Sequence, residues 1–331
     1  MEAILTEGLT KHYKVGFWRP RPYLALDALS LRVNEGEVFG FLGPNGAGKT
    51  TTLKLLMQLI YPTSGRAEIL GRPIGDPAVR RRIGYLPENP YFYDYLTAEE
   101  LLEYFAGLFG YEKRERRRRA ARLLDDVGIG AERRLQLRKF SKGMLQRVGI
   151  AQALVNDPSV VFFDEPMSGL DPLGRRAIRE LILALRDKGC TVFFSSHVLS
   201  DAEALCSRVA ILAAGRLVAE GALSELLAFR VRGWELVVAG LTPAALERVG
   251  HGGRVAQATP LGAERFALQL TLAIPPEQIV SELVHHGAQI VSLNPIRDTL
   301  EDLFVRRVTD APVARGLDLE AVPSTDRRVR S

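Results

Sequence analysis

The sequence predicts an α/β fold, in which a mostly parallel β-sheet carries helices on both faces, followed by a smaller α+β module. Apolar runs that fit buried strands alternate with segments of helical periodicity as far as Gly221, and this alternation is typical of parallel sheets. A glycine-rich loop at residues 43–50 joins one such strand to a helix. Beyond Gly221 the order becomes strand, helix, strand, strand, helix, strand, a split βαβ arrangement of the ferredoxin-like kind.

Length and composition indicate a globular protein of two domains. The 331 residues exceed one ordinary domain, and 47% apolar with 25% charged residues is an ordinary composition. No apolar run reaches the ~18 residues that span a bilayer, and the N-terminus lacks the pattern of a signal peptide. Cys190 and Cys206 have neither disulfide nor metal spacing, which fits a reducing cytoplasm. The net charge of +5 is consistent with nucleic acid or an anionic membrane and selects neither.

Two strands are expected near the N-terminus, at residues 2–8 and 24–33, joined by a basic, proline-containing connection at 14–22. Tyr13 precedes this connection, and its ring could stack on a purine base or simply pack at the end of a strand. A buried strand at 38–42 then leads into the glycine-rich loop.

The glycine-rich loop matches the phosphate-binding P-loop pattern G-x-x-x-x-G-K-[ST]. Its glycines let the backbone curl so that N–H groups face an anion, and the helix that begins here would place phosphates at a helix N-terminus. Lys49 would reach the β- and γ-phosphates, and the Thr50 hydroxyl would bind Mg²⁺. The expected nucleotide contacts are Gly43, Pro44, Asn45, Gly46, Ala47, Gly48, Lys49, Thr50 and Thr51.

The next segment is expected to be mainly helical. The helix after the loop should end at Pro62 and Gly65, short strands and turns should fill 66–86, and the proline-flanked residues 87–90 predict a loop or hinge. A helical pattern over 97–127 opens with a capping box of Thr97 and Glu100. Its basic run at 113–119 indicates either a solvated helix face or a surface that meets anionic lipid or an acidic partner.

An acidic pair follows the next strand. Ser141 can cap a helix that runs to Val155, and the apolar strand at 160–163 ends in Asp164 and Glu165. Adjacent residues at a strand end point in different directions, so one carboxylate can hold Mg²⁺ while the other acts on an attacking water. Further helices are expected at 172–188 and 199–205, and strands at 191–195, 209–212 and 216–219.

The C-terminal third predicts the ferredoxin-like module. After a short helix at 224–229 and a linker at 230–233, we expect strands at 234–238, 254–257, 265–272 and 288–293, and helices at 243–249 and 276–286. His285 and His286 end the second helix, where the helix dipole favours them and no third metal ligand is near. An amphipathic helix at 299–308 follows, and residues from 310 on predict a disordered tail.

Residues 140–147, FSKGMLQR, resemble the signature motif of the ATP-binding subunits of ABC transporters, usually written LSGGQ. Ser141 and Gly143 are retained, whereas Phe140, Lys142 and Met144 depart from the pattern. Residues 168–171 resemble the family's D-loop, His197 resembles its switch histidine, which contacts the γ-phosphate, and Tyr13 then matches the adenine-stacking aromatic. The motifs stand in the family's order and cover roughly residues 2–225.

The resemblance implies a P-loop NTPase cassette over residues 1–229, with a RecA-like parallel sheet core, an antiparallel β subdomain and a helical subdomain at about 88–158. An α+β accessory domain at 230–309 and a tail at 310–331 complete the chain. ATP and Mg²⁺ are the implied cofactors. Glu165, His197 and Lys49 are the implied catalytic residues. Outside residues 43–51, the implied nucleotide contacts are Tyr13, Glu88, Ser141, Gly143 and Asp171. The implied Mg²⁺ ligands are Thr50, Glu88 and Asp164.

One departure concerns Glu88, which stands where the family usually has a glutamine that ligates Mg²⁺ and couples the site to the membrane subunit. Glu adds a negative charge near the triphosphate and can still ligate the ion. This residue, the variant signature and the C-terminal module with its 297–304 helix resemble the branch that partners ABC-2-type membrane subunits, mostly exporters. The implied protein lies on the cytoplasmic face of the cell membrane. It works with a separate permease subunit and with a second copy of itself or a paralogous subunit.

The alternative is a soluble ATPase of the same type that acts on nucleic acid or the ribosome. Such proteins generally carry two cassettes, a long coiled-coil insertion or zinc modules, and the sequence has one P-loop, no sustained heptads and no paired CxxC. Nucleic acid is therefore not expected as a partner. A purely regulatory binding module is disfavoured because the full hydrolytic set is present.

Overall fold

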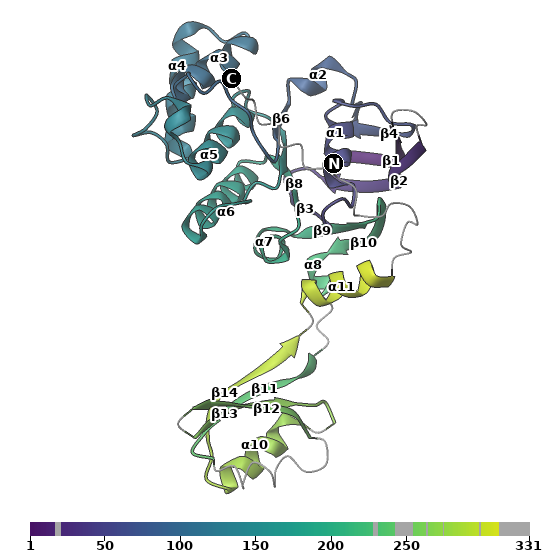
Figure 1. Cartoon of the computed structure of the whole chain (residues 1–331), viewed down its shortest axis with the longest axis vertical. Coiled ribbons are helices and arrows are strands. Elements are labelled where there is room, and N and C mark those ends of the chain that lie inside the picture. The colour runs from purple at the N-terminus through teal and green to yellow at the C-terminus, as the bar shows by residue number, and fades with distance from the viewer. Residues whose placement is uncertain are drawn as a thin grey trace, which may run out of the picture.

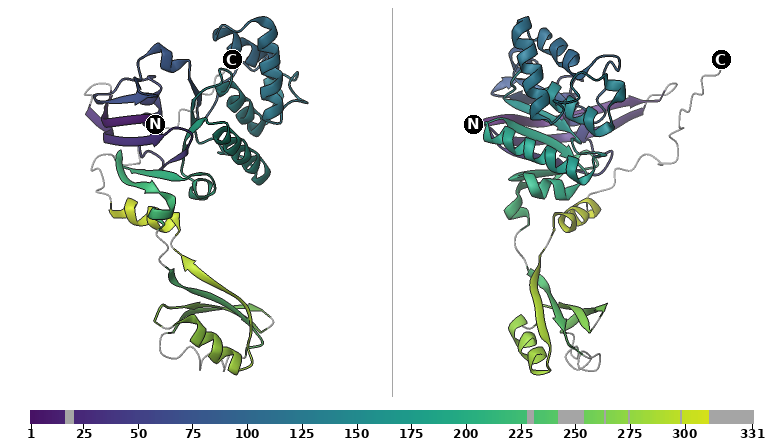
Figure 2. Two further views of the ribbon diagram at one scale, coloured as in Figure 1. Left: turned by 180° about the vertical axis from the view of Figure 1, so that it is seen from behind. Right: turned by 90° about the vertical axis from the view of Figure 1, so that its left-hand side faces the viewer.

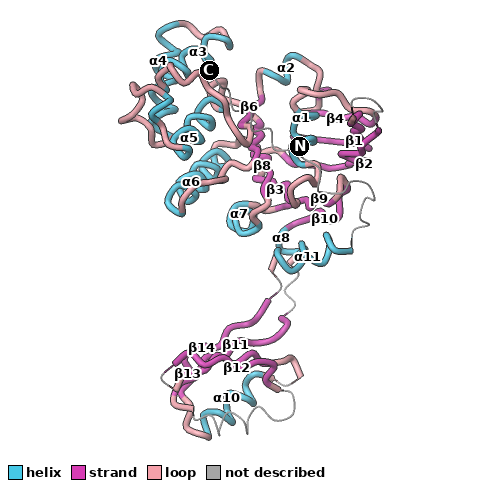
Figure 3. Tube along the Cα trace, viewed as in Figure 1, coloured by secondary structure: helices cyan, strands magenta, loops and turns pink. Residues whose placement is uncertain are grey.

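The computed structural model describes residues 1–16, 21–227, 231–241, 254–262, 264–273, 275–297 and 299–310. A large N-terminal body contains two sheets and a helical lobe, and a smaller module follows it in the chain (Figure 1). Figure 3 shows that helices and strands alternate through the large body, whereas the smaller module is mainly strand.

The central sheet has the strand order β10-β9-β3-β8-β7-β6. Its strands are β3 (Val38–Leu42), β6 (Ile83–Leu86), β7 (Val160–Asp164), β8 (Thr191–Ser196), β9 (Arg208–Ala213) and β10 (Arg216–Ala222). The five strands from β9 to β6 run parallel, and β10 pairs antiparallel with β9. Every residue of β3, β7 and β8 is buried, as a parallel sheet covered on both faces requires. The predicted parallel sheet is confirmed.

Alternate residues of these strands enter two cores on opposite faces of the sheet. Val38, Leu42 and Phe163 face the core that holds α3 (Ala98–Leu108), α5 (Lys142–Ala153), α6 (Pro172–Asp187) and α7 (Leu199–Leu205). On the other face, Phe193 lies with its ring centre 5.7 Å from those of Phe39 and Phe162, and α1 (Lys49–Leu56) packs there. The aromatic strand residues thus fill the space between the central sheet and the N-terminal sheet.

The N-terminal sheet is antiparallel, in the order β2-β1-β4-β5. It consists of β1 (Glu2–Val15), β2 (Arg21–Asn34), β4 (Ser64–Ile69) and β5 (Arg72–Pro73). The predicted connection at 14–22 is wrong at its ends, because both strands continue into it and Tyr13 pairs with Tyr23. The helix expected to end at Pro62 ends at Leu56 instead, and the left-handed φ of 53° at Gln58 turns the chain away.

The helical lobe begins after β6 and a loop. α2 (Pro77–Arg80) precedes the lobe. The lobe consists of α3, α4 (Lys113–Asp126), a short 3₁₀ turn (Leu137–Lys139) and α5. The helical segment predicted over 97–127 forms two helices, α3 and α4, because the chain turns at Gly110 with φ 86°. The predicted capping box is confirmed, since the Glu100 backbone N–H donates to Thr97 Oγ1 at 3.2 Å and Thr97 N–H donates to Glu100 Oε2 at 2.8 Å.

The basic run on α4 is largely paired within the chain. Arg118 and Arg119 contact Glu115, at 2.6 and 3.1 Å, and Arg119 also contacts Asp157 at 2.5 Å. Arg117 lies 3.7 Å from Glu103. These pairs favour the interpretation of the run as a solvated helix face over that of a surface for lipid headgroups.

The smaller module is an antiparallel sheet in the order β12-β13-β11-β14, the order of ferredoxin-like sheets. Its elements are β11 (Val231–Ala239), β12 (Val255–Gly262), β13 (Arg265–Leu270), α10 (Pro276–His285) and β14 (Gln289–Arg297). The predicted linker at 230–233 is wrong from Val231 on, where β11 begins. The expected helix at 243–249 and residues 311–331 of the expected tail lie outside the described residues.

The chain returns to the large body after the module. α8 (Leu223–Leu226) precedes β11, and α11 (Leu300–Asp310) follows β14. α11 lies beside α8 and the central sheet in two views (Figures 1 and 2), and Leu300 is fully buried in the larger core. The expected boundary at residue 229 stays a prediction, and α11, expected in the second domain, packs on the first.

Both cysteines are buried and free. Burial raises the pKa of the Cys190 thiol to about 12 and also raises the pKa of Cys206, so both stay protonated and unreactive at neutral pH. Within the described part of the chain, every helix is too short or too polar to cross a membrane.

Candidate nucleotide-binding and hydrolysis site

Three loops meet at one edge of the central sheet because they follow neighbouring parallel strands. Leu42, the last residue of β3, pairs with Ser196 of β8, and Asp164 of β7 pairs with Ser195. The glycine-rich loop follows β3, Glu165 follows β7 and His197 follows β8. Ligand sites in open α/β sheets lie at the carboxyl ends of the strands, so this edge is the candidate site.

The glycine-rich loop is closely packed against the chain behind it. A Cβ on Gly43 would lie 2.5 Å from the Leu212 carbonyl oxygen, and Gly48 has φ 107° with the Ala25 carbonyl oxygen 2.6 Å from a Cβ placed there. Neither position accepts a larger side chain without moving backbone. Gly48 is the N-cap of α1, so the loop aims the first N–H groups of that helix at the site.

Lys49 is held inside the loop. Its Nζ donates to the carbonyl oxygens of Gly43 at 2.7 Å and Pro44 at 3.2 Å, and it lies 3.5 Å from Glu165 Oε1. The side chains of Lys49 and Glu165 are 7% and 8% exposed, so the two charges interact with little solvent screening. The ammonium therefore stands at the centre of the loop, between the backbone and the acidic residue.

Glu165 has a left-handed backbone with φ 50°, which is uncommon for a residue with a side chain and costs of order 1–3 kcal/mol. Its N–H donates to the carbonyl and hydroxyl oxygens of Ser195, both at 3.2 Å. Its carboxylate lies between Lys49 and His197, whose Nδ1 is 2.9 Å from Glu165 Oε2. The turn after β7 thus directs this carboxylate into the site, whereas Asp164 stays in the sheet.

Asp164 fits a metal ligand. It is 1% exposed; Oδ1 accepts a hydrogen bond from Ser195 Oγ at 2.5 Å, while Oδ2 has no hydrogen-bond partner. A buried carboxylate oxygen without a partner is costly, and a cation would satisfy it. In the described ranges, no three acidic, histidine or cysteine side chains gather as a metal cluster. Mg²⁺ needs none, because it usually takes one or two carboxylates together with water and phosphate oxygens.

Glu88 lies on the same side of the site. It follows β6, is exposed, and lines the cavity over the glycine-rich loop. Burial, and then the negative charges of Asp164 and Glu88, raise the pKa of the Tyr85 phenol on β6 to about 12. Thr50 lines the same cavity. Of the three residues predicted to hold Mg²⁺, Glu88 and Thr50 line the cavity, and Asp164 ends β7, the strand that leads to Glu165.

The cavity over the loop measures about 380 Å³, which is within the range of small-molecule sites. Its lining is drawn from the β1–β2 hairpin, the glycine-rich loop, α1 and the two acidic loops: Tyr13, Tyr23, Ala25, Pro44, Asn45, Gly46, Gly48, Lys49, Thr50, Thr51, Glu88 and Glu165. Of the predicted contacts in the glycine-rich segment, Gly43 and Ala47 lie behind this surface and are buried.

Tyr23 lines the cavity and is absent from the sequence prediction. It pairs with Tyr13 across the hairpin, so both rings lie on one face of the sheet, at the spacing of cross-strand neighbours. The Lys11 ammonium lies 5.3 Å from the Tyr13 ring centre and donates to the Tyr61 carbonyl oxygen at 2.6 Å. No sequence motif marks Tyr23, because only the pairing register of β1 with β2 brings it beside Tyr13.

Ser141, Gly143 and Asp171 do not line this cavity. Ser141 is exposed and caps α5, accepting from Met144 N–H at 3.3 Å. Asp171 caps α6, accepting from Gly174 N–H at 2.7 Å. The two segments touch, because a Cβ on Gly143 would lie 3.2 Å from the Leu170 side chain. Within one chain, the structure keeps these predicted nucleotide contacts apart from the P-loop.

Gln146 is a second residue that sequence reasoning missed. It lies on α5, is 2% exposed, and its Nε2 donates to the Pro166 carbonyl oxygen at 3.1 Å. Pro166 follows Glu165 directly. The helix that begins at Ser141 is therefore tied to the turn that carries the acidic residue.

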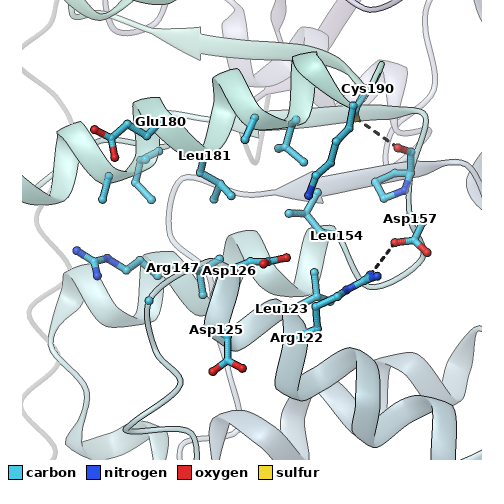
Figure 4. Close-up of a pocket in the computed structure, with 18 of the residues that line it drawn as sticks. Arg122, Leu123, Asp125, Asp126, Arg147, Leu154, Asp157, Glu180, Leu181 and Cys190 are labelled. Carbon is cyan, nitrogen blue, oxygen red and sulfur yellow. Dashed lines mark hydrogen bonds and ion pairs between the residues drawn. The ribbon is translucent and has the colours of Figure 1, made fainter.

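A larger cavity, of about 900 Å³, lies between α4, α5 and α6 (Figure 4). Leu123, Leu154 and Leu181 line its apolar part, and its polar rim includes the ion pair of Arg122 with Asp157 at 3.1 Å. Arg147 and Glu180 approach it from α5 and α6 (Figure 4). It contains no glycine-rich loop and none of the predicted site residues, so we assign the chemistry to the smaller cavity.

Comparisons with known proteins agree with this geometry. A family model described as "ABC transporter" matches residues 26–168. An uncharacterised ABC transporter ATP-binding protein of Synechocystis is 46% identical over 93% of this chain and 85% of that protein. A Nod factor export ATP-binding protein of Burkholderia orbicola is 34% identical over 86% of this chain and 91% of that protein. A dimeric ATP-binding cassette, solved in a post-hydrolysis state with ADP and Pi, matches 66% of this chain and 98% of that chain with a TM-score of 0.62 and 29% identity. The predicted cassette fold is confirmed.

Proposed function

The chain belongs to the ATP-binding subunits of ABC transporters and is an ATPase that powers transport, and from this premise we propose that it drives export through a separate ABC-2-type membrane subunit. Similarity to a Nod factor export ATP-binding protein supports export. The incomplete site supports a pair of subunits: Lys49, Glu165 and His197 meet at one sheet edge, while Ser141 lies outside the cavity over the loop and is exposed. A second copy of the chain, or a paralogous subunit, would supply Ser141 and Gly143.

The head-to-tail pair follows from the charges involved. The N-terminus of α5 offers N–H groups and a positive dipole end to an anion, and Ser141 stands at that end. A γ-phosphate bound by one P-loop would attract the α5 N-terminus of the second subunit. The ATP-binding cassette solved with ADP and Pi, which is similar to this chain, is dimeric. ATP would then bind the closed pair better than the open one, and this difference in affinity can move a membrane subunit.

Hydrolysis would depend on three side chains of the same subunit. Lys49 would stabilise charge on the β- and γ-phosphates, Glu165 would orient or deprotonate the attacking water, and His197 would hold the γ-phosphate. Phosphoryl transfer needs positioning and charge stabilisation rather than a covalent intermediate. Mg²⁺, held by Thr50, Asp164 and Glu88, would neutralise part of the developing charge. Tyr13 would stack on the adenine, with Tyr23 beside it.

The variant Ser141→Arg tests the composite site. Placed in a Glu165→Gln background, which slows ATP consumption, it should leave ATP binding within about twofold and abolish the ATP-dependent dimer, because an arginine fills the space that the phosphate needs. Light scattering after gel filtration measures the dimer. The control is Ser224→Arg on α8, an exposed serine outside the site, which should dimerise normally. A normal dimer of the Ser141→Arg protein would contradict the proposal.

An exposed aromatic loop offers a surface for the membrane subunit. Tyr91, Tyr93 and Tyr95 follow Glu88 and are 94%, 51% and 61% exposed, and tyrosines clustered on a surface are typical of protein interfaces. Because Glu88 lines the nucleotide cavity, a partner seated here would sense the site. The proposed location is the cytoplasmic face of the membrane.

The variant Tyr91→Asp tests this surface in the chain's own host. The fraction that sediments with membranes should fall, with an apparent affinity loss of about 30-fold if Tyr91 is a hot spot worth about 2 kcal/mol. Tyr61→Asp is the control, because Tyr61 is also exposed, at 70%, and lies outside the segment that carries the three tyrosines. Sedimentation with ribosomes or nucleic acid in a salt-dependent manner would instead support the alternative of a soluble ATPase.

A further inference from the structure

The last helix of the described chain completes the large body rather than the module that it follows. Leu300 is fully buried in the larger core, and Leu303 and Phe304 pack against that core. The module has its own core, formed around Leu236, Leu268 and Leu283, and none of the described α11 side chains, at 300–305, belongs to it. The apolar side of α11 therefore binds the cassette.

A polar contact fixes the start of α11 on α7. The backbone N–H of Leu300 donates to Glu203 Oε1 at 2.8 Å, so the carboxylate of α7 satisfies a free N–H at the first turn of α11, where negative charge is favoured. Thr299 and Asp302 cap the same turn, with the Asp302 N–H donating to Thr299 Oγ1 at 3.2 Å and the Thr299 hydroxyl donating to Asp302 Oδ2 at 2.8 Å. Two N–H groups of the first turn, those of Leu300 and Asp302, thus have side-chain partners in this position.

α7 begins two residues after His197. β8 ends at Ser196, whose Oγ accepts from the Val198 N–H at 2.9 Å, so the chain turns tightly through the histidine into the helix. On its other side, the buried Asp201 of α7 accepts from Arg179 Nη2 of α6 at 2.5 Å. A seven-residue helix held from two sides has little freedom, and its position sets that of His197.

The module is connected directly to this contact. β14 ends at Arg297, three residues before Leu300, and Arg232 at the start of β11 lies 3.8 Å from Asp302. The start of β11 and the end of β14 therefore lie on the side of the module nearest the cassette (Figure 1), and Arg232 contacts the first turn of α11. A displacement of the module would be transmitted to α11, and from α11 to α7.

We propose that Glu203 and Leu300 are positioning residues for His197, and that the accessory module controls the hydrolysis step through α11 and α7. The proposal rests on the function proposed for His197. It makes the module a regulator of turnover that leaves nucleotide binding unchanged, because none of the α11 side chains that the structure describes, from Leu300 to Val305, lines the nucleotide cavity.

The test compares the steady-state ATP hydrolysis of Glu203→Ala and Leu300→Ala with that of the unmodified protein. Both variants should lower kcat by about 10- to 100-fold, since a misplacement of about 1 Å remote from the chemistry can cost that much, with KM and ATP affinity changed by less than about twofold. Glu203→Gln, which keeps an acceptor oxygen, should recover most of the rate. Glu282→Ala removes an ion pair inside the module, with Arg254 at 3.1 Å, and should hydrolyse ATP at the normal rate.

A double variant separates positioning from loss of stability. If α11 acts through His197, Glu203→Ala combined with His197→Ala should be no slower than His197→Ala alone. Additive losses, or a normal kcat in both Glu203→Ala and Leu300→Ala, would overturn the proposal. The same holds if Glu203→Ala and Leu300→Ala lower only the unfolding temperature. Should His197→Ala itself turn over normally, the proposed role of His197 fails, and that result is distinct from the others.

Discussion

Glu165→Gln is expected to bind ATP and to lose hydrolysis by about 10²- to 10⁴-fold, the usual contribution of a general base. The amide has the size of the carboxylate and can still contact His197, which lies 2.9 Å from Glu165 Oε2, but it cannot accept a proton from water. It also removes a negative charge 3.5 Å from Lys49. ATP should therefore bind at least as tightly as in the unmodified protein, and the ATP-bound dimer should accumulate.

Phosphate release under single-turnover conditions measures the chemical step, and gel filtration with ATP measures the dimer. Glu180→Gln is the matched control, because Glu180 is an exposed glutamate whose partner is Arg176, at 2.9 Å on the surface of α6. This control should hydrolyse ATP normally. A normal rate in Glu165→Gln would remove the base from its proposed role and leave only positioning by Lys49 and His197.

The parts of the site that a local pattern encodes are those that the sequence predicts. The glycine-rich loop, Asp164 and Glu165 after one apolar strand, and His197 after another are each readable within a few residues, and parallel pairing then brings them to one edge. Strand types and the capping residues Thr97 and Ser141 are predictable for the same reason. These features depend on short-range stereochemistry.

Features that depend on pairing over long distances were not predictable. Tyr23 joins the cavity only because the β1–β2 register sets it opposite Tyr13, and a single tyrosine in a strand has no signature. The left-handed turns at Gln58 and Glu165 are uncommon for residues with side chains, so the end of α1 was placed too late. Likewise, the periodicity of α11 shows that it has an apolar face but not which body that face covers.

The structure also explains why Ser141 and Asp171 are prominent in the sequence yet remote from the cavity. Both are helix caps, at α5 and α6, and a cap is a complete structural role by itself. A contribution of Ser141 to phosphate binding then requires a second molecule. Sequence similarity alone cannot separate these two roles, whereas the dimerisation test of Ser141→Arg can.

Lys49→Ala is expected to weaken ATP binding by about 10- to 150-fold, which corresponds to the loss of about 1.5–3 kcal/mol for a hydrogen bond to a charged group. The Lys49 ammonium is nearly buried, held by the carbonyl oxygens of Gly43 and Pro44, so water cannot replace it. The loss should be smaller for AMP, which lacks the β- and γ-phosphates. Lys54→Ala, an exposed lysine on the same helix, should bind ATP normally, and equal affinities for all three proteins would refute the role of Lys49.

Part of the Lys49→Ala loss should come from Glu165. Without the ammonium 3.5 Å away, the Glu165 carboxylate would repel the triphosphate in a poorly screened site. The double variant Lys49→Ala with Glu165→Gln should therefore bind ATP more tightly than Lys49→Ala alone, and the difference measures the coupling between the two charges. Identical affinities would mean that the ion pair seen here does not act on the nucleotide. Stronger binding would show that Lys49 both attracts phosphate and shields it from the residue that acts on the water.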